Sequence, residues 1–302
     1  MEIVVFGAGS LGSLIGAKLA TVHDVTLVGR DPHMAAVQAD GLRVTGLDSF
    51  VVHPRAMTEG TDLMADLAVV TVKSFDTEEA AQSLSTGTFD AVLSLQNGMG
   101  NEDILNRVLD CPILAGTTTY GAVLREPGRV EWTGRGDIVL GPWTDTATEF
   151  VEPVRRAFEE ADLDPIAAED MPSRLWEKLA VNAAINPVTA LARVENGALS
   201  DPGLGDVAHA AAREAARTAS AAGADLAADR AIERTDEVIA ATAKNRSSML
   251  QDVAAGRRTE IDAITGYIVD RGDAHGIEVP TNRVLLALVR GWERGQGIRG
   301  DA

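Results

Sequence analysis

The sequence predicts a two-domain α/β protein, with a parallel sheet wrapped by helices first and an all-helical domain second. Short apolar runs alternate with helical patterns in the N-terminal half, as they do in a parallel sheet. A glycine-rich turn follows the first of these runs. Beyond Met171-Pro172 the patterns are helical and rich in alanine, so we place the domains at residues 1–168 and 169–302.

The elements follow in order along the chain. Apolar runs bounded by turn residues predict buried strands at residues 2–6, 24–28, 66–72, 91–96, 112–121, 129–132 and 138–141. Periodic apolar patterns predict helices at 13–21 and 151–161 in the first domain. In the second domain they predict helices at 173–193, 204–222, 224–245, 248–254, 259–271 and 281–293.

The composition of the chain argues against some classes of binding partner. The chain has 302 residues, 45% of them hydrophobic, which is enough for two globular domains. Its 45 acidic and 27 basic residues give a net charge of −18, so we expect an acidic surface that repels nucleic acid and anionic membranes. The lysines are Lys18, Lys73, Lys178 and Lys244. A high-salt cytoplasm and a GC-rich genome would each explain so few.

Other residue types restrict the location and the chemistry. The single cysteine, Cys111, excludes an internal disulfide, and we expect it to be a buried structural thiol. The five histidines show no metal-ligand spacing, so no metal site is expected. No apolar run has the length of a membrane helix, and the chain opens on a strand rather than a signal peptide. These features indicate a cytoplasmic protein.

The turn Gly7-Ala8-Gly9-Ser10-Leu11-Gly12 has the GxGxxG spacing of a dinucleotide-binding loop between a strand and a helix. Gly7 allows the tight turn, Gly9 lets the backbone approach a pyrophosphate, and Gly12 allows close packing of helix on strand. The N–H groups at the start of the helix would face the phosphates. The turn predicts a Rossmann-type domain, and a glycine turn of another α/β fold is the alternative.

The end of the second strand discriminates between cofactors. Domains that bind NAD usually place an acidic residue there for the ribose 2′-hydroxyl, whereas this chain has Gly29-Arg30. Because an arginine matches a 2′-phosphate, NADP is favoured, and the neighbouring Asp31 leaves NAD open. An ordinary surface-loop arginine is the alternative.

Lys73 and Asn97 each come directly after a predicted strand. Ligands of open parallel sheets bind outside the carboxyl ends of the strands, so both side chains are candidates to face the nicotinamide end of a cofactor. A turn formed by Asn97-Gly98 without a ligand is the alternative.

Lys178, Asn182 and Asn186 recur every four residues, along one face of the helix predicted at 173–193. The residues between them are mostly apolar, so this polar stripe is expected to face a substrate. A sheltered lysine there could donate a proton or polarise a carbonyl. A solvated helix face is the alternative.

Ser248 and Glu260 form a second group. Residues 245–252 are expected to start a helix that is capped by a serine or by Asn245. Thr259 and Asp262 have the spacing of a capping box, which leaves Glu260 unexplained. A helix cap for Ser248 and a surface carboxylate for Glu260 are the alternatives.

Together these motifs resemble the ketopantoate reductase family over nearly the whole chain, in order. The matching segments are Gly7 to Gly12, Val72-Lys73, Asn97-Gly98-x-Gly100, Gly116-Thr117-Thr118-Thr119, Trp176-x-Lys178-Leu179-x-x-Asn182-x-x-x-Asn186-Pro187, Glu195-Asn196-Gly197, Ser247 to Asp252, and Thr259 to Asp262. The resemblance implies NADPH-dependent reduction of 2-dehydropantoate to (R)-pantoate, on the route to pantothenate and coenzyme A. It also implies a helical domain like the C-terminal one of 6-phosphogluconate dehydrogenase.

The resemblance further implies roles for single residues. Lys178 would donate the proton, and Glu260 would help to orient it near the nicotinamide ribose or the substrate hydroxyl. Asn97 would contact both cofactor and substrate. The other substrate ligands would be Asn182, Asn186, Asn196 and Ser248. The other cofactor contacts would come from Gly7, Ala8, Gly9, Ser10, Leu11, Gly12, Arg30, Lys73 and Gly121.

Two other functions stay open, namely a reductase of another 2-oxo acid and a dinucleotide sensor without turnover. A sensor needs no proton donor, so the presence of Lys178 and Glu260 argues against it. The sequence does not give the oligomeric state, and it is compatible with a homodimer.

Overall fold

The computed structural model describes residues 1–300, which fall into two compact units. The first unit comprises Met1–Gln96 and Asn101–Met171, and the second comprises Asn97–Gly100 and the chain from Pro172 onward. The short loop Asn97–Gly100 therefore packs with the helices of the second unit, although it follows a strand of the first.

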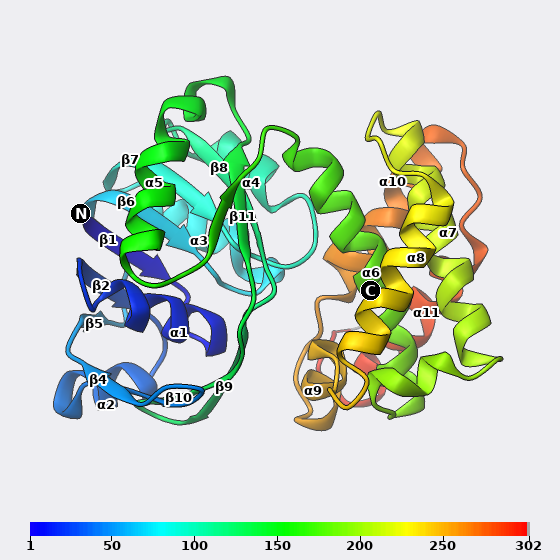
Figure 1. The fold of residues 1–302 in the computed structure, drawn as a ribbon, viewed down its shortest axis with the longest axis horizontal. Coiled ribbons are helices and arrows are strands. Elements are labelled where there is room, and N and C mark those ends of the chain that lie inside the picture. Colours follow the sequence, from blue (N-terminus) through cyan, green and yellow to red (C-terminus); the bar gives the residue numbers. More distant parts are fainter. Residues whose placement is uncertain (301–302) are drawn as a thin grey trace. The chain divides into compact units, whose positions relative to one another are not determined.

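An eight-stranded sheet forms the centre of the first unit, with the strand order β12-β11-β8-β7-β6-β1-β2-β5 (Figure 1). Neighbouring strands are parallel, except that β11 runs antiparallel to β8. The strands are β1 (Glu2–Phe6), β2 (Asp24–Val28), β5 (Arg55–Met57), β6 (Met64–Val70), β7 (Thr88–Ser94), β8 (Ile113–Thr118), β11 (Ile138–Pro142) and β12 (Pro165–Ala167).

Helices bury both faces of this sheet. Along β1, Ile3 and Val5 belong to one apolar cluster and Val4 belongs to another, so successive side chains point into opposite layers. The first layer includes helices α1 (Ser10–Leu19), α2 (His33–Asp40) and α5 (Thr148–Glu160). The second includes α3 (Thr77–Leu84) and α4 (Asn101–Val108). Burial on both faces explains why the strands read as continuous apolar runs.

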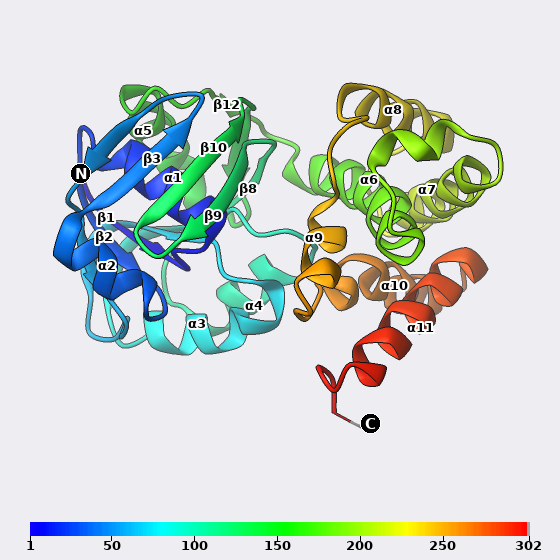
Figure 2. The ribbon, with the colours of Figure 1, turned by 90° about the horizontal axis from the view of Figure 1, so that it is seen from below.

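A smaller sheet covers α1 on the side away from the main sheet (Figure 2). Its strand order is β4-β3-β10-β9, formed by β4 (Phe50–Val52), β3 (Leu42–Gly46), β10 (Arg129–Gly134) and β9 (Gly121–Glu126). The sequence predicted only β10 of these four strands. The strand predicted over 112–121 is present as β8 but ends earlier, at Thr118, because the chain bends where the Tyr120 N–H donates to Thr118 Oγ1 at 3.2 Å, and β9 begins at Gly121.

The second unit is helical. Its helices are α6 (Met171–Ala192), α7 (Leu204–Ala221), α8 (Ala228–Ala241), α9 (Ser248–Ala254), α10 (Tyr267–His275) and α11 (Pro280–Gly295). Buried alanines of α7 allow α8, α10 and α11 to pack against it. The two-domain α/β prediction is confirmed, and α9 has the predicted bounds.

Two helices of this unit differ from prediction. The helix expected at 224–245 is shorter at both ends, because Ala227 is extended and α8 stops at Ala241. The helix expected at 259–271 is replaced by a π-helical turn, Asp262–Gly266, that leads into α10. Within residues 1–300, no helix combines the length and apolar character that a membrane span needs.

Candidate active site

The glycine turn after β1 has room for a ligand at one position and no room for side chains at two others. Gly7 has φ +110°, and a Cβ on it would lie 2.5 Å from the Val72 nitrogen. A Cβ on Gly12 would lie 2.4 Å from the Gly7 oxygen, so α1 can approach the strand only because Gly12 has none. A Cβ on Gly9 would meet nothing closer than 3.9 Å. The space beside Gly9 is therefore open to a pyrophosphate.

The start of α1 completes this cradle. Gly9 is the N-cap residue, and no side chain caps the helix, so backbone N–H groups of the first turn remain for an anion. Ser10 Oγ instead accepts the Leu124 N–H of β9 at 3.0 Å. The Val28 carbonyl accepts N–H groups from Gly7 at 2.9 Å and Ala8 at 2.8 Å, which fixes the loop beside the end of β2.

Arg30 follows β2 with 83% of its side chain exposed. Its Nη2 lies 2.7 Å from Asp76 Oδ2, in an ion pair that the sequence did not suggest. Asp31 Oδ1 accepts the Ala35 N–H of α2 at 3.2 Å, so this carboxylate serves its own helix. Arg30 is thus an exposed cation beside the glycine turn, with a carboxylate already against it.

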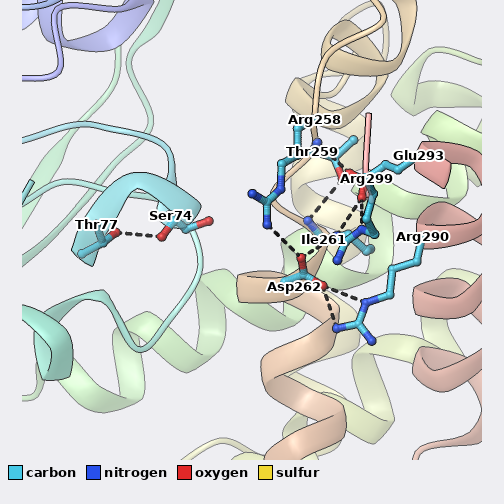
Figure 3. A network of polar contacts seen from close by, with 9 residues as sticks. All are labelled: Ser74, Thr77, Arg258, Thr259, Ile261, Asp262, Arg290, Glu293 and Arg299. Carbon is cyan, nitrogen blue, oxygen red and sulfur yellow. Dashed lines mark hydrogen bonds and ion pairs between the residues drawn. The ribbon is translucent and has the colours of Figure 1, made fainter. Parts of the chain in front are cut away.

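Lys73 and Gln96 lie at the ends of two neighbouring strands. Lys73 directly precedes a 3₁₀ turn, Ser74–Asp76. Gln96 Nε2 donates to the Val72 carbonyl at 3.1 Å and to Thr77 Oγ1 at 2.7 Å, and Thr77 in turn donates to the Ser74 carbonyl (Figure 3). The buried Gln96 therefore holds the backbone next to Lys73 against the end of β7.

Gly121 begins β9 opposite Gly134 of β10. A Cβ on Gly121 would lie 2.7 Å from Thr133 Oγ1 and 3.0 Å from the Gly134 nitrogen, so packing inside the small sheet already favours glycine here. Its predicted contact with a cofactor remains a prediction.

The polar stripe of α6 stands on a helix that is buried around it. Lys178 and Asn182 are half-buried, and Asn186 is 6% exposed. Trp176 packs on Tyr267 of α10, with ring centroids 5.6 Å apart. These burials contradict the alternative of a solvated helix face, because at such a face the side chains would be exposed.

A chain of hydroxyls joins α6 to the start of α9. Ser247 is the N-cap residue of α9, and its Oγ accepts the Leu250 N–H at 3.1 Å. The same Oγ lies 2.7 Å from Thr189 Oγ1, and Thr189 donates to the Ile185 carbonyl of α6 at 2.8 Å. The alternative in which Ser248 caps the helix is therefore wrong, because Ser247 makes that bond and Ser248 is exposed at the first position of α9.

Asn196 begins the 3₁₀ turn Asn196–Ser200 and is buried. Its N–H donates to the Asn245 carbonyl at 3.0 Å, and its Nδ2 donates to Thr242 Oγ1 at 2.9 Å. These bonds tie Asn196 to the segment that leads into α9. They give it a structural role besides any contact with a substrate.

Glu260 is 5% exposed, which contradicts the alternative of a surface carboxylate. Its neighbours are held by the carboxylate of Glu293 on α11, which is fully buried (Figure 3). Glu293 Oε1 accepts the Thr259 N–H at 2.8 Å and the Thr259 hydroxyl at 2.7 Å. The segment that carries Glu260 is thus fixed from α11.

The predicted capping box of Thr259 and Asp262 is wrong. Glu293 takes the Thr259 N–H that Asp262 would have accepted, and Asp262 instead pairs with Arg290 Nη2 at 2.7 Å and with Arg299 (Figure 3). Burial disfavours the charged form of Asp262, but the hydrogen bonds from Arg299 and Arg290 outweigh it, so its pKa lies below the ordinary value. Charged residues of α11 therefore take the two partners of the predicted capping box, although they are far away in the chain.

The loop Asn97–Gly100 packs against the turn that follows Glu260. The Met99 N–H donates to the Ala263 carbonyl at 3.0 Å. Gly98 has φ +82°, and a Cβ on it would lie 2.6 Å from Ala263 Cβ. Only glycine fits there, and the contact brings the Asn97 loop to the Glu260 segment. The same unit contains α6 and the start of α9.

Sequence reasoning missed several residues that hold this site. Ser247 and Ser248 are adjacent hydroxyls, so the pattern could not say which one caps α9. Glu293 and Asp76 act on segments far away in the chain, and no local spacing signals such pairs.

Cys111 is half-buried rather than buried. Desolvation, with a smaller effect from Asp110, raises the pKa of its thiol to about 11, which keeps it a thiol at neutral pH. Among residues 1–300, His, Cys, Asp and Glu side chains form no group of three or more that could hold a metal ion.

Comparison with known proteins agrees with this architecture. A family model described as ketopantoate reductase PanE/ApbA matches residues 3–145, and the model of its C-terminal domain matches residues 170–293. The chain is 40% identical to a 2-dehydropantoate 2-reductase of Pyrococcus horikoshii, over 97% of this chain and 98% of that protein. It is 41% identical to one of Halobacterium salinarum, over 96% and 98%.

Solved structures show the same fold. A PanE/ApbA family ketopantoate reductase from Ralstonia eutropha matches with a TM-score of 0.90 and 34% identity, over 98% of this chain and 100% of that one. A D-mandelate dehydrogenase in complex with NADH and anilino(oxo)acetate matches with a TM-score of 0.94 at 24% identity, over 99% and 100%, which is a likeness of fold. Both domain models and near-full-length relatives lead to one conclusion: this chain belongs to the ketopantoate reductase PanE/ApbA family.

Proposed function

We propose that this protein is a 2-dehydropantoate 2-reductase, which reduces the C2 ketone of 2-dehydropantoate to (R)-pantoate with NADPH. The observation that carries the proposal is the half-buried Lys178, set among buried residues of α6, in a chain that matches the reductase family over both domains. The chain matches relatives that carry this name, and each match covers nearly the whole length of both proteins.

A nicotinamide dinucleotide fits the residues of the first unit. The open space beside Gly9 and the uncapped start of α1 suit a pyrophosphate. Arg30 would meet the adenosine end, and Lys73 and Gly121 are further proposed contacts of this unit. Asn97, which packs with the second unit, is one more proposed contact. When bound and reduced, the cofactor supplies the hydride that the ketone carbon receives.

The second unit would supply the proton and hold the substrate. As the ketone is reduced, negative charge grows on its oxygen, and Lys178 would stabilise that charge and donate the proton. Glu260 would orient Lys178 and contact a ribose or substrate hydroxyl. Asn97, Asn182, Asn186, Asn196 and Ser248 would hydrogen-bond the substrate. Amides and a hydroxyl can bind the substrate's hydroxyl and carboxylate without an arginine clamp.

The direct test is the loss of reduced-nicotinamide absorbance with 2-dehydropantoate, run with NADPH and with NADH across a salt series. A panel of other 2-oxo acids is assayed under the same conditions. We expect the highest kcat/KM for 2-dehydropantoate. A higher value for another 2-oxo acid would reassign the substrate, and tight nucleotide binding without turnover on any of them would make the protein a sensor.

The surroundings of the reaction remain predictions from the sequence. The sequence predicts a cytoplasmic location, which suits the proposed reaction, and cell fractionation tests it. Sedimentation would distinguish a monomer from a homodimer.

A further inference from the structure

The ion pair between Arg30 and Asp76 lies where the cofactor's adenosine ribose should be recognised. Arg30 is the second residue after β2, and the Val28 carbonyl at the end of that strand accepts the N–H groups of Gly7 and Ala8. The glycine turn and the arginine therefore share one edge of the sheet. A dinucleotide held by the turn has its adenosine ribose near the end of the second strand.

Asp76 brings a negative charge to that edge from another part of the chain. It ends the 3₁₀ turn after β6, and its Oδ2 lies 2.7 Å from Arg30 Nη2. Its side chain makes no capping bond to α3, although Asp76 is the N-cap residue of that helix. Asp31 is directed to the Ala35 N–H instead. Asp76 is thus the carboxylate that pairs with Arg30.

We propose that Asp76 determines the choice between NADPH and NADH by competing with the 2′-phosphate for Arg30. A phosphate on the guanidinium would lie within a few ångströms of the Asp76 carboxylate, and the two anions would repel each other. A ribose 2′-hydroxyl carries no charge and can donate to the same carboxylate. Asp76 therefore lowers the preference for NADPH that Arg30 alone would give, and both cofactors can be used.

The inference rests on the part of the proposed function that concerns nucleotide binding. Its test is to measure the Kd of NADPH and the Kd of NADH for the full chain without substrate. The quenching of tryptophan fluorescence by the bound nucleotide reports binding. In Asp76→Asn the ratio Kd(NADH)/Kd(NADPH) should rise roughly five- to tenfold at low salt, as expected for one half-buried charge near the surface. The gain should shrink as salt rises, because both groups are exposed enough to be screened.

A matched control removes the same charge nearby without touching Arg30. Glu78, two residues on, pairs with Arg107, so Glu78→Gln should leave the Kd ratio unchanged. Arg30→Gln should lower the ratio, and a further Asp76→Asn change should then raise it by less than it does when Arg30 is present. Thermal unfolding of each variant shows that the fold is retained.

The outcomes separate the two claims. A Kd ratio that stays constant or falls in Asp76→Asn, or that rises equally in Glu78→Gln, overturns the role of Asp76 while leaving the reductase proposal intact. If the unaltered protein binds neither nucleotide, the proposed function itself fails.

Discussion

At the scale of single residues, Lys178 is the most exacting test of the proposed chemistry. Replacing it by alanine should lower kcat by about 10²- to 10⁴-fold, because a positioned proton donor contributes that much to a reduction. The Kd for NADPH and the thermal midpoint should stay near those of the unaltered protein, since most of the proposed cofactor contacts, the glycine turn and Arg30 among them, lie in the first unit. Stopped-flow and steady-state absorbance measure the loss.

The matched control is Lys244, which is exposed just after α8. Lys244→Ala removes the same charge and should keep full turnover. If Lys178→Ala also keeps near-normal turnover, Lys178 is not the proton donor.

The adjacent serines at the start of α9 should behave differently when changed. Ser247→Ala removes the helix cap and the contact with Thr189, and should lower the free energy of unfolding by about 1–2 kcal/mol. Ser248→Ala should leave stability unchanged and raise KM for the substrate. Urea denaturation and steady-state kinetics on both variants provide the comparison, and equal effects on stability would contradict the assignment of the cap.

The sequence was sufficient at this scale where a side chain's role follows from its own helix. The spacing of Lys178, Asn182 and Asn186 predicts one face, and their burial agrees with it. It was insufficient where two neighbouring residues have the same chemistry, as with Ser247 and Ser248. Only the position of Thr189 on α6 decides which hydroxyl turns inward.

At the scale of elements, α11 determines the conformation of the segment that carries Glu260. Glu293→Gln would remove the charge that pairs with Arg299 and weaken the acceptor for Thr259. Because the carboxylate is fully buried, the free energy of unfolding should fall by about 3 kcal/mol. If Glu293 also positions Glu260 beside Lys178, kcat should fall by a larger factor than the affinity for NADPH does.

Glu237→Gln is the comparison, because it breaks the exposed pair with Arg234 on α8 and should leave the thermal midpoint nearly unchanged. If the two changes lower the urea midpoint equally, the burial of Glu293 adds nothing to the stability that its ion pair and hydrogen bonds provide.

His33 links three elements of the first unit through one uncharged ring. Its Nδ1 accepts the Gly128 N–H at 2.9 Å, and its Nε2 lies 2.9 Å from Ser13 Oγ on α1. Burial lowers its pKa, so the folded protein binds the proton less well than the unfolded chain does. The stability from this group is fully present above the ordinary pKa of about 6.5 and is lost as pH falls below it.

The measurement is the urea midpoint between neutral pH and pH 5. The midpoint of His33→Gln should fall less over this range than that of the unaltered protein. His275→Gln, at an exposed position, should keep the original slope. Identical slopes in all three proteins would exclude His33 as a source of the pH dependence.

Helices and strands could be predicted where neighbouring residues define them, and not where residues far away in the chain do. The bounds of β1 and β2 follow from apolar runs between turns, and those runs are buried on both faces. The small sheet was missed because β3 finds its parallel partner β10 far along the chain, and no local pattern encodes that pairing. The capping box failed for the same reason, since Glu293 comes from another helix.

At the scale of the whole molecule, the net charge of −18 is the dominant electrostatic feature. Like charges on one folded chain repel, and this repulsion weakens the compact state relative to the expanded one. Added salt shortens the Debye length from about 10 Å at 0.1 M to about 3 Å at 1 M, so the repulsion should fall with ionic strength. The thermal midpoint should therefore rise with KCl and level off near 1 M.

Scanning calorimetry in KCl and in NaCl at matched ionic strength is the measurement, with sucrose as an uncharged control. Screening predicts the same rise in both salts and a plateau once the Debye length is shorter than the spacing of surface charges. Exclusion of solute from the surface would instead raise the midpoint steadily, in sucrose as well. A midpoint that falls with KCl would mean that the many surface ion pairs of this chain outweigh its net repulsion, because those pairs are also screened.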